Sequence, residues 1–310
     1  MRPMDSARTQ RVFLTGATGT IGGAILGALQ STGRYQVDCL VRSPEAASWV
    51  SSLGASGILA NMTDCDLRAR IKPAREYKFI VHAAQEHYST HSDAEIADAD
   101  RLAVESLQRL CSERTQLMIY TSGVWIFGDC GQKEITDATP FKPFEAAAAR
   151  SDLIGRLRAQ TVYPWAHLCP PSFVYGTRGP LLSVVRTMQT GPIDIIDDEH
   201  VLWSVVERDD LARAYLAMLL HAKSGDFHVV AEEDPVSRVF FYERIGALIK
   251  GSQIRRRSRA FFEERWAARE LETLFGSQPV DARGIRNSCL WRPQAVFSKW
   301  IEQHIPVIAG

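Results

Sequence analysis

Short hydrophobic runs alternate with longer mixed stretches along the first half of the chain. Runs of this kind that end in small or polar residues are typical of buried parallel strands joined by helices. The runs, with the residues that end them, lie at 11–15, 36–42, 58–64, 79–84, 117–128 and 166–176. Between them, residues 24–29 and 94–111 have the pattern of helices. The alternation predicts an α/β fold whose parallel sheet is doubly wound, with helices on both faces.

A glycine-rich segment directly follows the first predicted strand. Gly16, Gly19 and Gly22 precede the predicted helix at 24–29. A strand, a glycine turn and a helix in this order can bind a dinucleotide. The first glycine permits the tight turn, the second lets the backbone approach a pyrophosphate, and the third lets helix and strand pack closely. Unpaired N–H groups at the helix start would then hold the phosphates.

The same segment also has features of a targeting signal. Residues 12–33 carry no charge, arginines precede them, and Gly19, Gly23 and Gly27 have the spacing of membrane helix pairs. However, the many glycines and threonines make this stretch a poor apolar span. No later stretch reaches about 18 consecutive apolar residues. The cofactor turn is therefore the better interpretation, and we expect no membrane partner.

The second predicted strand ends in Val41, Arg42 and Ser43 rather than in an acid. The dinucleotide fingerprint places an acid near this position to bind the ribose 2′-hydroxyl. An acid would repel a 2′-phosphate, whereas the Arg42 guanidinium can pair with one through its planar fork. We therefore predict NADP as the cofactor. The alternatives are NAD as cofactor and an ordinary exposed role for Arg42.

The chain combines this strand pattern with a G-x-x-G-x-x-G turn that Thr15 precedes. In these features it resembles the extended, epimerase/dehydratase-like branch of the short-chain dehydrogenase/reductase superfamily. The resemblance implies a Rossmann sheet, a smaller C-terminal α/β substrate lobe and a set of cofactor-binding residues. Asp64 in this set would lie near the adenine, or could serve as a helix N-cap. The set comprises Gly16, Thr18, Gly19, Thr20, Ile21, Gly22, Arg42, Asp64, Ala83, Ala84, Thr121, Arg150, Pro170 and Phe173.

The segments expected to carry the catalytic residues depart from the family pattern. The family's catalytic serine or threonine falls on Gly123, and the nearest hydroxyls belong to Ser122 and Thr121. Its Y-x-x-x-K motif falls on Ala146 and Arg150. Arginine can hold a ribose or phosphate, but its pKa is too high for proton transfer, and alanine has no proton to donate. The chain thus resembles atypical members that keep the cofactor fold and lose the standard proton relay.

Another group must supply the proton if redox chemistry survives. We predict Ser122, His87 and Tyr88 as the catalytic candidates, because they follow the fifth and fourth predicted strands at the expected rim of the cleft, and histidine titrates in a suitable range. Each could instead be a packed or surface residue. Further polar residues after strands four to six are Glu86, Tyr163 and Tyr175. Trp125 and Phe127 are expected to line an apolar substrate pocket.

Later segments extend the resemblance over most of the chain. Residues 166–176 match the family's sixth strand with its V-Y-G segment. Residues 203–212 match a strand-to-helix corner in which Asp210 is the expected helix cap. Residues 290–293 match G-W-x-P, with Leu290 in place of the glycine. The match is specific for fold and cofactor but not for substrate.

The length of 310 residues fits about two domains. We expect residues 1–179 and 201–224 to form the dinucleotide-binding Rossmann domain. Residues 180–200 and 225–310 would form the substrate lobe, which closes over the strand ends where ligands bind in such sheets.

Composition narrows the classes of partner. The 36 basic and 36 acidic residues give a formal net charge of zero, which removes the basic excess expected of a nucleic-acid binder. The basic cluster at 255–259 precedes a predicted helix at 261–275 that carries four glutamates, so a solvated surface is the expected role. Docking of an anionic substrate group is the alternative. Six scattered cysteines without metal-ligand spacing predict reduced thiols, no metal site and a cytoplasmic location.

Three functions are compatible with these features. The first is an NADP-dependent oxidoreductase for a small non-sugar carbonyl or alcohol. The second is a non-redox enzyme, for cyclisation, isomerisation or elimination, on the same fold. The third is a dinucleotide-binding sensor that regulates a partner. Relatives are commonly dimers, so a homodimer is also expected.

Overall fold

The computed structural model describes residues 9–64, 67–71, 75–86 and 90–310. His87 and Tyr88, two of the predicted catalytic candidates, lie outside these residues. The chain divides into two compact units, each described here by itself. The first contains residues 1–121, 155–167 and 215–226, and the second contains residues 122–154, 168–214 and 227–310.

A seven-stranded sheet confirms the predicted α/β fold. Its strand order is β11-β6-β5-β4-β1-β2-β3, and the pairs β1–β2, β1–β4, β2–β3 and β4–β5 are parallel. The order places β1 centrally, with β2 and β4 as its neighbours. The strands are β1 (Gln10–Thr15), β2 (Tyr35–Val41), β3 (Ser56–Leu59), β4 (Phe79–His82), β5 (Leu117–Thr121), β6 (Trp165–Cys169) and β11 (Phe227–Val229).

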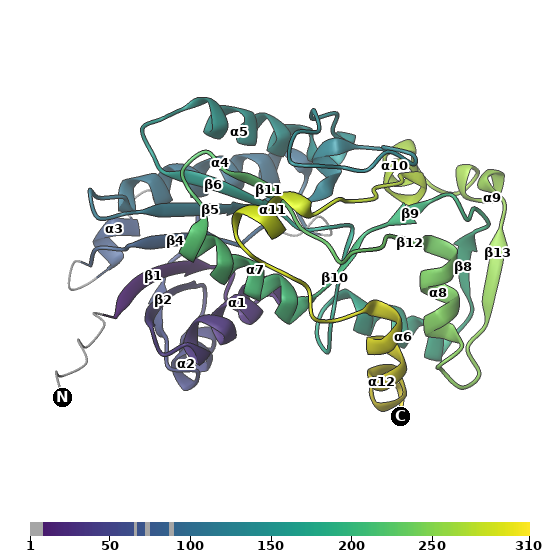
Figure 1. Ribbon diagram of the computed structural model, residues 1–310. Coiled ribbons are helices and arrows are strands. Elements are labelled where there is room, and N and C mark those ends of the chain that lie inside the picture. The colour runs from purple at the N-terminus through teal and green to yellow at the C-terminus, as the bar shows by residue number, and fades with distance from the viewer. Residues whose placement is uncertain (1–8, 65–66, 72–74, 87–89) are drawn as a thin grey trace. The chain divides into compact units, whose positions relative to one another are not determined.

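Helices connect these strands, as parallel pairing requires. Helices α1 and α4 lie on opposite faces of the sheet, so the winding is double as predicted (Figure 1). A capping box starts α4, in which the Ser92 and Glu95 side chains each accept from the other residue's backbone N–H. The helices are α1 (Thr20–Ser31), α2 (Pro44–Ser52), α3 (Leu67–Arg70), α4 (Asp93–Leu110), α5 (Ala148–Ala159) and α7 (Arg208–His221).

The second unit adds short strands and further helices. The strands pair as three two-stranded sheets, β10 with β7, β12 with β9 and β13 with β8. They are β7 (Phe173–Tyr175), β8 (Ile193–Ile196), β9 (Leu202–Trp203), β10 (Val205–Glu207), β12 (Val236–Ser237) and β13 (Ile254–Arg257). The helices are η1 (Val124–Phe127), η2 (Glu145–Ala147), α6 (Pro180–Thr190), α8 (Arg238–Gly246), α9 (Arg259–Glu263), α10 (Ala268–Phe275), α11 (Arg283–Ser288) and α12 (Phe297–Ala309).

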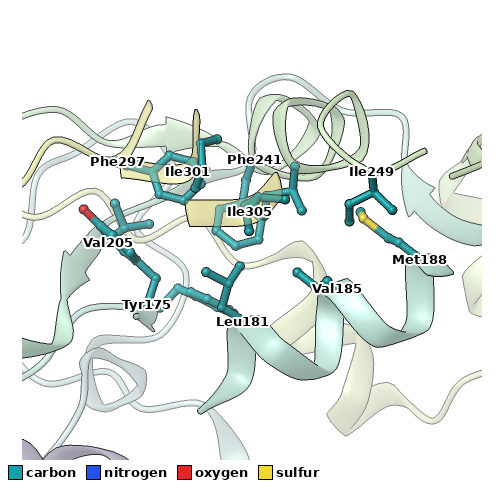
Figure 2. Close-up of a cluster of buried hydrophobic side chains, with 12 residues drawn as sticks. Tyr175, Leu181, Val185, Met188, Val205, Phe241, Ile249, Phe297, Ile301 and Ile305 are labelled. Atoms are coloured by element: carbon teal, nitrogen blue, oxygen red, sulfur yellow. The ribbon is translucent and has the colours of Figure 1, made fainter. Parts of the chain in front are cut away.

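A hydrophobic cluster built from α6, α8, α12, β7 and β10 forms a core of the second unit (Figure 2). Phe241 and Phe297 stack with ring centroids 5.0 Å apart. Leu181, Val185 and Ile301 are buried beside them. Burying a side chain of this size contributes about 2 kcal/mol, so the cluster holds three helices that are distant in sequence.

The predicted helix at 261–275 is wrong as a single element. The structure contains α9 and α10, with residues 264–267 between them. The Glu270 carboxylate accepts a hydrogen bond from the Ala267 N–H at 3.0 Å, which starts a new helix there. The four glutamates indicated a helix exposed to solvent, but they did not indicate that a second helix begins within the segment.

The predicted cap of α7 is also wrong. The Glu207 carboxylate accepts from the N–H groups of Asp209 and Asp210, at 2.6 and 2.9 Å, and so caps the first turn. The Asp210 carboxylate instead binds Arg213 and accepts from the N–H groups of Gln294 and Ala295. Asp210 therefore anchors the chain that follows the L-W-R-P segment.

Leu290, which replaces the glycine of that segment, has a φ of 57°. This left-handed conformation brings Cβ close to the backbone and costs about 1 kcal/mol for a residue other than glycine. The Trp291 indole donates to the Asp210 carbonyl at 3.0 Å, which holds the segment in place. Leu290 thus has a backbone conformation that glycine adopts without this cost.

No helix among the described residues is both long enough and apolar enough to span a membrane.

Candidate functional site

The glycine turn after β1 is closed by its own backbone. Gly16 has a φ of 75°, and its carbonyl accepts from the Gly19 N–H at 2.9 Å. A Cβ at Gly16 would lie 2.5 Å from the Ala83 carbonyl oxygen, and a Cβ at Gly22 would overlap the Gly16 carbonyl. Only glycine permits both approaches. The roles predicted for Gly16 in the turn and for Gly22 in packing follow from these contacts.

Thr15 links this turn to the end of β4. Its buried hydroxyl accepts from the N–H groups of Ala83 and Ala84 at 3.2 Å each and lies 2.8 Å from His82 Nδ1. Because the oxygen already accepts two bonds, its proton is donated to Nδ1, which places the ring proton on Nε2. His82 is 1% exposed. It is a packed, hydrogen-bonded residue.

A cavity of about 180 Å³ opens beside the turn within the first unit. It brings together six residues of the predicted cofactor set. These are Gly16, Thr18, Gly19, Arg42, Ala83 and Ala84. The other lining residues are Leu40, Val41, Met62, Gln85 and Glu86. Backbone from the ends of β1, β2 and β4 therefore surrounds one space.

The start of α1 adds an anion-binding feature to this cavity. Gly19 is the N-cap, no side chain caps the helix, and its first turn contains no acid. The first N–H groups of α1 therefore have no side-chain acceptor competing for them, and the helix dipole favours a negative group there. This cradle fits the pyrophosphate of a dinucleotide.

An ion pair crosses the cavity rim. Arg42 Nη1 lies 3.3 and 3.2 Å from the two carboxylate oxygens of Glu86. The Arg42 side chain is 71% exposed, whereas that of Glu86 is 13% exposed. The charge predicted to select a 2′-phosphate therefore has a carboxylate beside it. The sequence signal for this pair is that opposite charges follow the two strands that flank β1, a signal that an interpretation of Glu86 as a proton donor alone misses.

The remaining predicted cofactor residues of the first unit do not line the cavity. Thr20, Ile21 and Gly22 form the first turn of α1. Asp64 accepts from the Asn61 N–H at 3.2 Å, so its carboxylate closes a local turn. The Thr121 hydroxyl lies 2.6 Å from that of Tyr215, a buried residue of α7 that the sequence reasoning did not select.

The other predicted residues belong to the second unit. Ser122 is 8% exposed, and its hydroxyl has no hydrogen-bond partner among the described residues. Arg150 lies in α5, and the Pro170 carbonyl accepts from the Val124 N–H at 3.2 Å. Phe173 is buried and stacks on Trp203, with centroids 5.8 Å apart. The structure thus shows Phe173 packed within the second unit.

The structure changes the picture of two further candidates. Phe127 is 1% exposed and packs against Phe141 and Phe227, and its place in an apolar substrate pocket stays a prediction. The Tyr175 hydroxyl donates to the buried Glu232 carboxylate. Burial, reinforced by the Glu232 charge, raises the pKa of Tyr175, so it is a poor proton donor at neutral pH.

The sequence resemblance aligns Ala146 with the family's tyrosine and Gly123 with its serine or threonine, and neither residue carries a hydroxyl. A Cβ at Gly123 would meet no atom of the described residues within 4 Å, so none of them excludes a side chain there. Loss of the standard proton relay stays a prediction.

Comparisons with known proteins agree with this geometry. The model of the family described as "NAD dependent epimerase/dehydratase family" matches residues 12–231. A ketoreductase of Stigmatella aurantiaca, which acts on 4-hydroxy-2-methyl-3-oxo-4-farnesyl-3,4-dihydroquinoline-1-oxide, is 26% identical over 235 residues, 73% of this chain and 69% of that protein.

Solved structures share the fold. The dTDP-glucose 4,6-dehydratase of Bacillus anthracis in complex with NAD has a TM-score of 0.77 at 16% identity, over 96% of this chain and 95% of that one. The UDP-glucose 4-epimerase of Thermus thermophilus in complex with NAD also has a TM-score of 0.77, at 15% identity, over 97% and 99%. At these identities the likeness concerns the fold alone.

Proposed function

Because the chain belongs to the NAD dependent epimerase/dehydratase family, we propose that it is an oxidoreductase that prefers NADP and acts on a small, non-sugar carbonyl or alcohol. The observation that carries the proposal is the cavity formed by the glycine turn, the β4 end and Arg42. The similarity to a ketoreductase supports the redox assignment. We also propose a cytoplasmic location, in keeping with the five described cysteines, which are all free. A homodimer stays a prediction.

Different residues of the cavity would bind different groups of the dinucleotide. The α1 start would hold the pyrophosphate, and Arg42 would pair with the 2′-phosphate. A nicotinamide dinucleotide, when bound, exchanges a hydride with the substrate. The chain's own contribution to proton transfer cannot come from Ala146, so water or a non-standard side chain would serve. Ser122, with its buried hydroxyl, is the described candidate.

The test is a set of small ketones and quinones incubated with the purified protein and NADPH. We expect the near-ultraviolet absorbance of NADPH to fall in step with formation of the alcohol. A matched reaction with Gly22→Ala, which disrupts the cradle, should show no such loss. Binding of NADPH to a partner protein with no turnover would instead favour a sensor.

A non-redox enzyme is the second candidate, favoured by the absence of hydroxyls at Ala146 and Gly123. It predicts conversion of a substrate, by cyclisation, isomerisation or elimination, with the NADPH absorbance unchanged. Consumption of one NADPH for each product molecule would contradict it.

A further inference from the structure

The Arg42–Glu86 pair carries an inference that deepens the proposed function and rests on it. The sequence assigns Arg42 to a 2′-phosphate, but the structure places a carboxylate against the same guanidinium. The question is which anion the arginine binds when a dinucleotide enters.

Both contacts from Glu86 use one nitrogen of the Arg42 fork. Nη1 lies within 3.3 Å of each carboxylate oxygen, while Nε and Nη2 make no hydrogen bond with another described residue. Part of the guanidinium is thus available, but its charge is already balanced by an acid. A phosphate that pairs with Arg42 must share the guanidinium with Glu86 or displace it.

The burial of the pair is asymmetric. The Glu86 side chain is 13% exposed, whereas Arg42 is 71% exposed. Glu86 is therefore the more buried partner, and it lines the cavity with the glycine turn. A 2′-phosphate that pairs with Arg42 at the rim would have to compete with the Glu86 carboxylate, in an environment that water screens only partly. A ribose 2′-hydroxyl carries no charge and can donate to a carboxylate.

We propose that Glu86 is a specificity-determining residue. It restrains Arg42 and lowers the preference for NADP(H), so that the protein also keeps a usable affinity for NAD(H). In this arrangement the acid that the dinucleotide fingerprint places after β2 is supplied from the end of β4, and the ratio of the two affinities is set by the pair.

The experiment measures dissociation constants for NADPH and NADH with the full chain, by isothermal titration calorimetry. Glu86→Gln keeps the size of the side chain and removes its charge. We expect it to tighten NADPH binding about tenfold and to weaken NADH binding about threefold, because it removes the carboxylate that would accept from the ribose 2′-hydroxyl. Glu76→Gln is the control, since Glu76 pairs with Arg114 at 3.0 Å and does not line the cavity. It should change neither affinity.

A double variant tests whether Glu86 acts through Arg42. In an Arg42→Ala background, Glu86→Gln should give no more than a twofold gain for NADPH. A full tenfold gain there would mean direct repulsion and would overturn restraint of Arg42 as the cause.

The proposal and the proposed function fail in different ways. If the wild-type protein binds neither dinucleotide although circular dichroism shows it folded, both are contradicted. If it binds them but Glu86→Gln leaves their ratio unchanged, the specificity role alone is wrong.

Discussion

At the scale of single residues, His228 joins three segments of the second unit. Its Nδ1 lies 2.7 Å from the Asp137 carboxylate and its Nε2 lies 3.1 Å from the Ser288 hydroxyl. The Val229 N–H also donates to Asp137, and a Cβ at Gly284 would overlap the Asp137 carboxylate. The order acid, imidazole, hydroxyl is that of a serine-hydrolase triad.

The protonation state of His228 is unsuited to serine-hydrolase chemistry. Burial alone would lower its pKa, but hydrogen bonds with Asp137 and Cys289 outweigh it and raise the pKa to about 9. A histidine that is protonated at neutral pH cannot accept the serine proton. The Ser288 hydroxyl in turn lies 2.9 Å from the Gly284 carbonyl, to which it donates. The three residues are therefore better described as a structural link.

This link predicts a stability that depends on pH. Since the pKa of His228 is higher in the folded protein than the ordinary 6.5, its contribution is complete below about pH 6.5 and is lost as the pH rises through about 9. We expect the link to contribute on the order of 2 kcal/mol at the acidic end of this window. Urea denaturation across the window should show a decline in the free energy of unfolding that His228→Gln reduces. An unchanged decline in the variant would assign the effect to other groups.

At the scale of elements, the connection between β1 and α1 depends on which glycines face the backbone. Gly22 faces the Gly16 carbonyl, whereas a Cβ at Gly27, on the same helix, would meet no atom within 4 Å in the part of the chain that the structure describes. The two glycines therefore allow a matched comparison within one helix.

Gly22→Ala should displace the turn, weaken dinucleotide binding at least tenfold and destabilise the protein by about 2 kcal/mol, because the overlap is with backbone. Gly27→Ala should stabilise the protein by about 0.5–1 kcal/mol through the higher helix propensity of alanine, with binding unchanged. Chemical denaturation and NADPH titration measure both effects. Equal behaviour of the two variants would contradict the assigned roles.

The same element shows what the sequence could predict. The strand, turn and helix were visible because hydrophobic periodicity and glycine spacing are local properties. The Arg42–Glu86 pair joins residues that follow β2 and β4 and depends on the strand order around β1. The burial of Phe127 depends on Phe141 and Phe227, and the break between α9 and α10 depends on a single cap at Glu270. The ion pair and the burial of Phe127 follow from tertiary contacts that no local pattern encodes, whereas the Glu270 cap is a contact within one helical turn.

At the scale of the whole molecule, the first unit holds the cavity and the second unit holds the hydrophobic cluster around α6, α8 and α12. A ligand that binds only the folded chain stabilises it by mass action, by about 2.7 kcal/mol at a concentration one hundred times its dissociation constant. NADPH at that excess should therefore raise the melting temperature by about 5 °C. Scanning calorimetry measures the shift, and the Gly22→Ala protein at the same NADPH concentration is the control that should show little of it. A wild-type melting temperature that neither NADPH nor NADH raises would contradict dinucleotide binding, whatever the likeness of the fold.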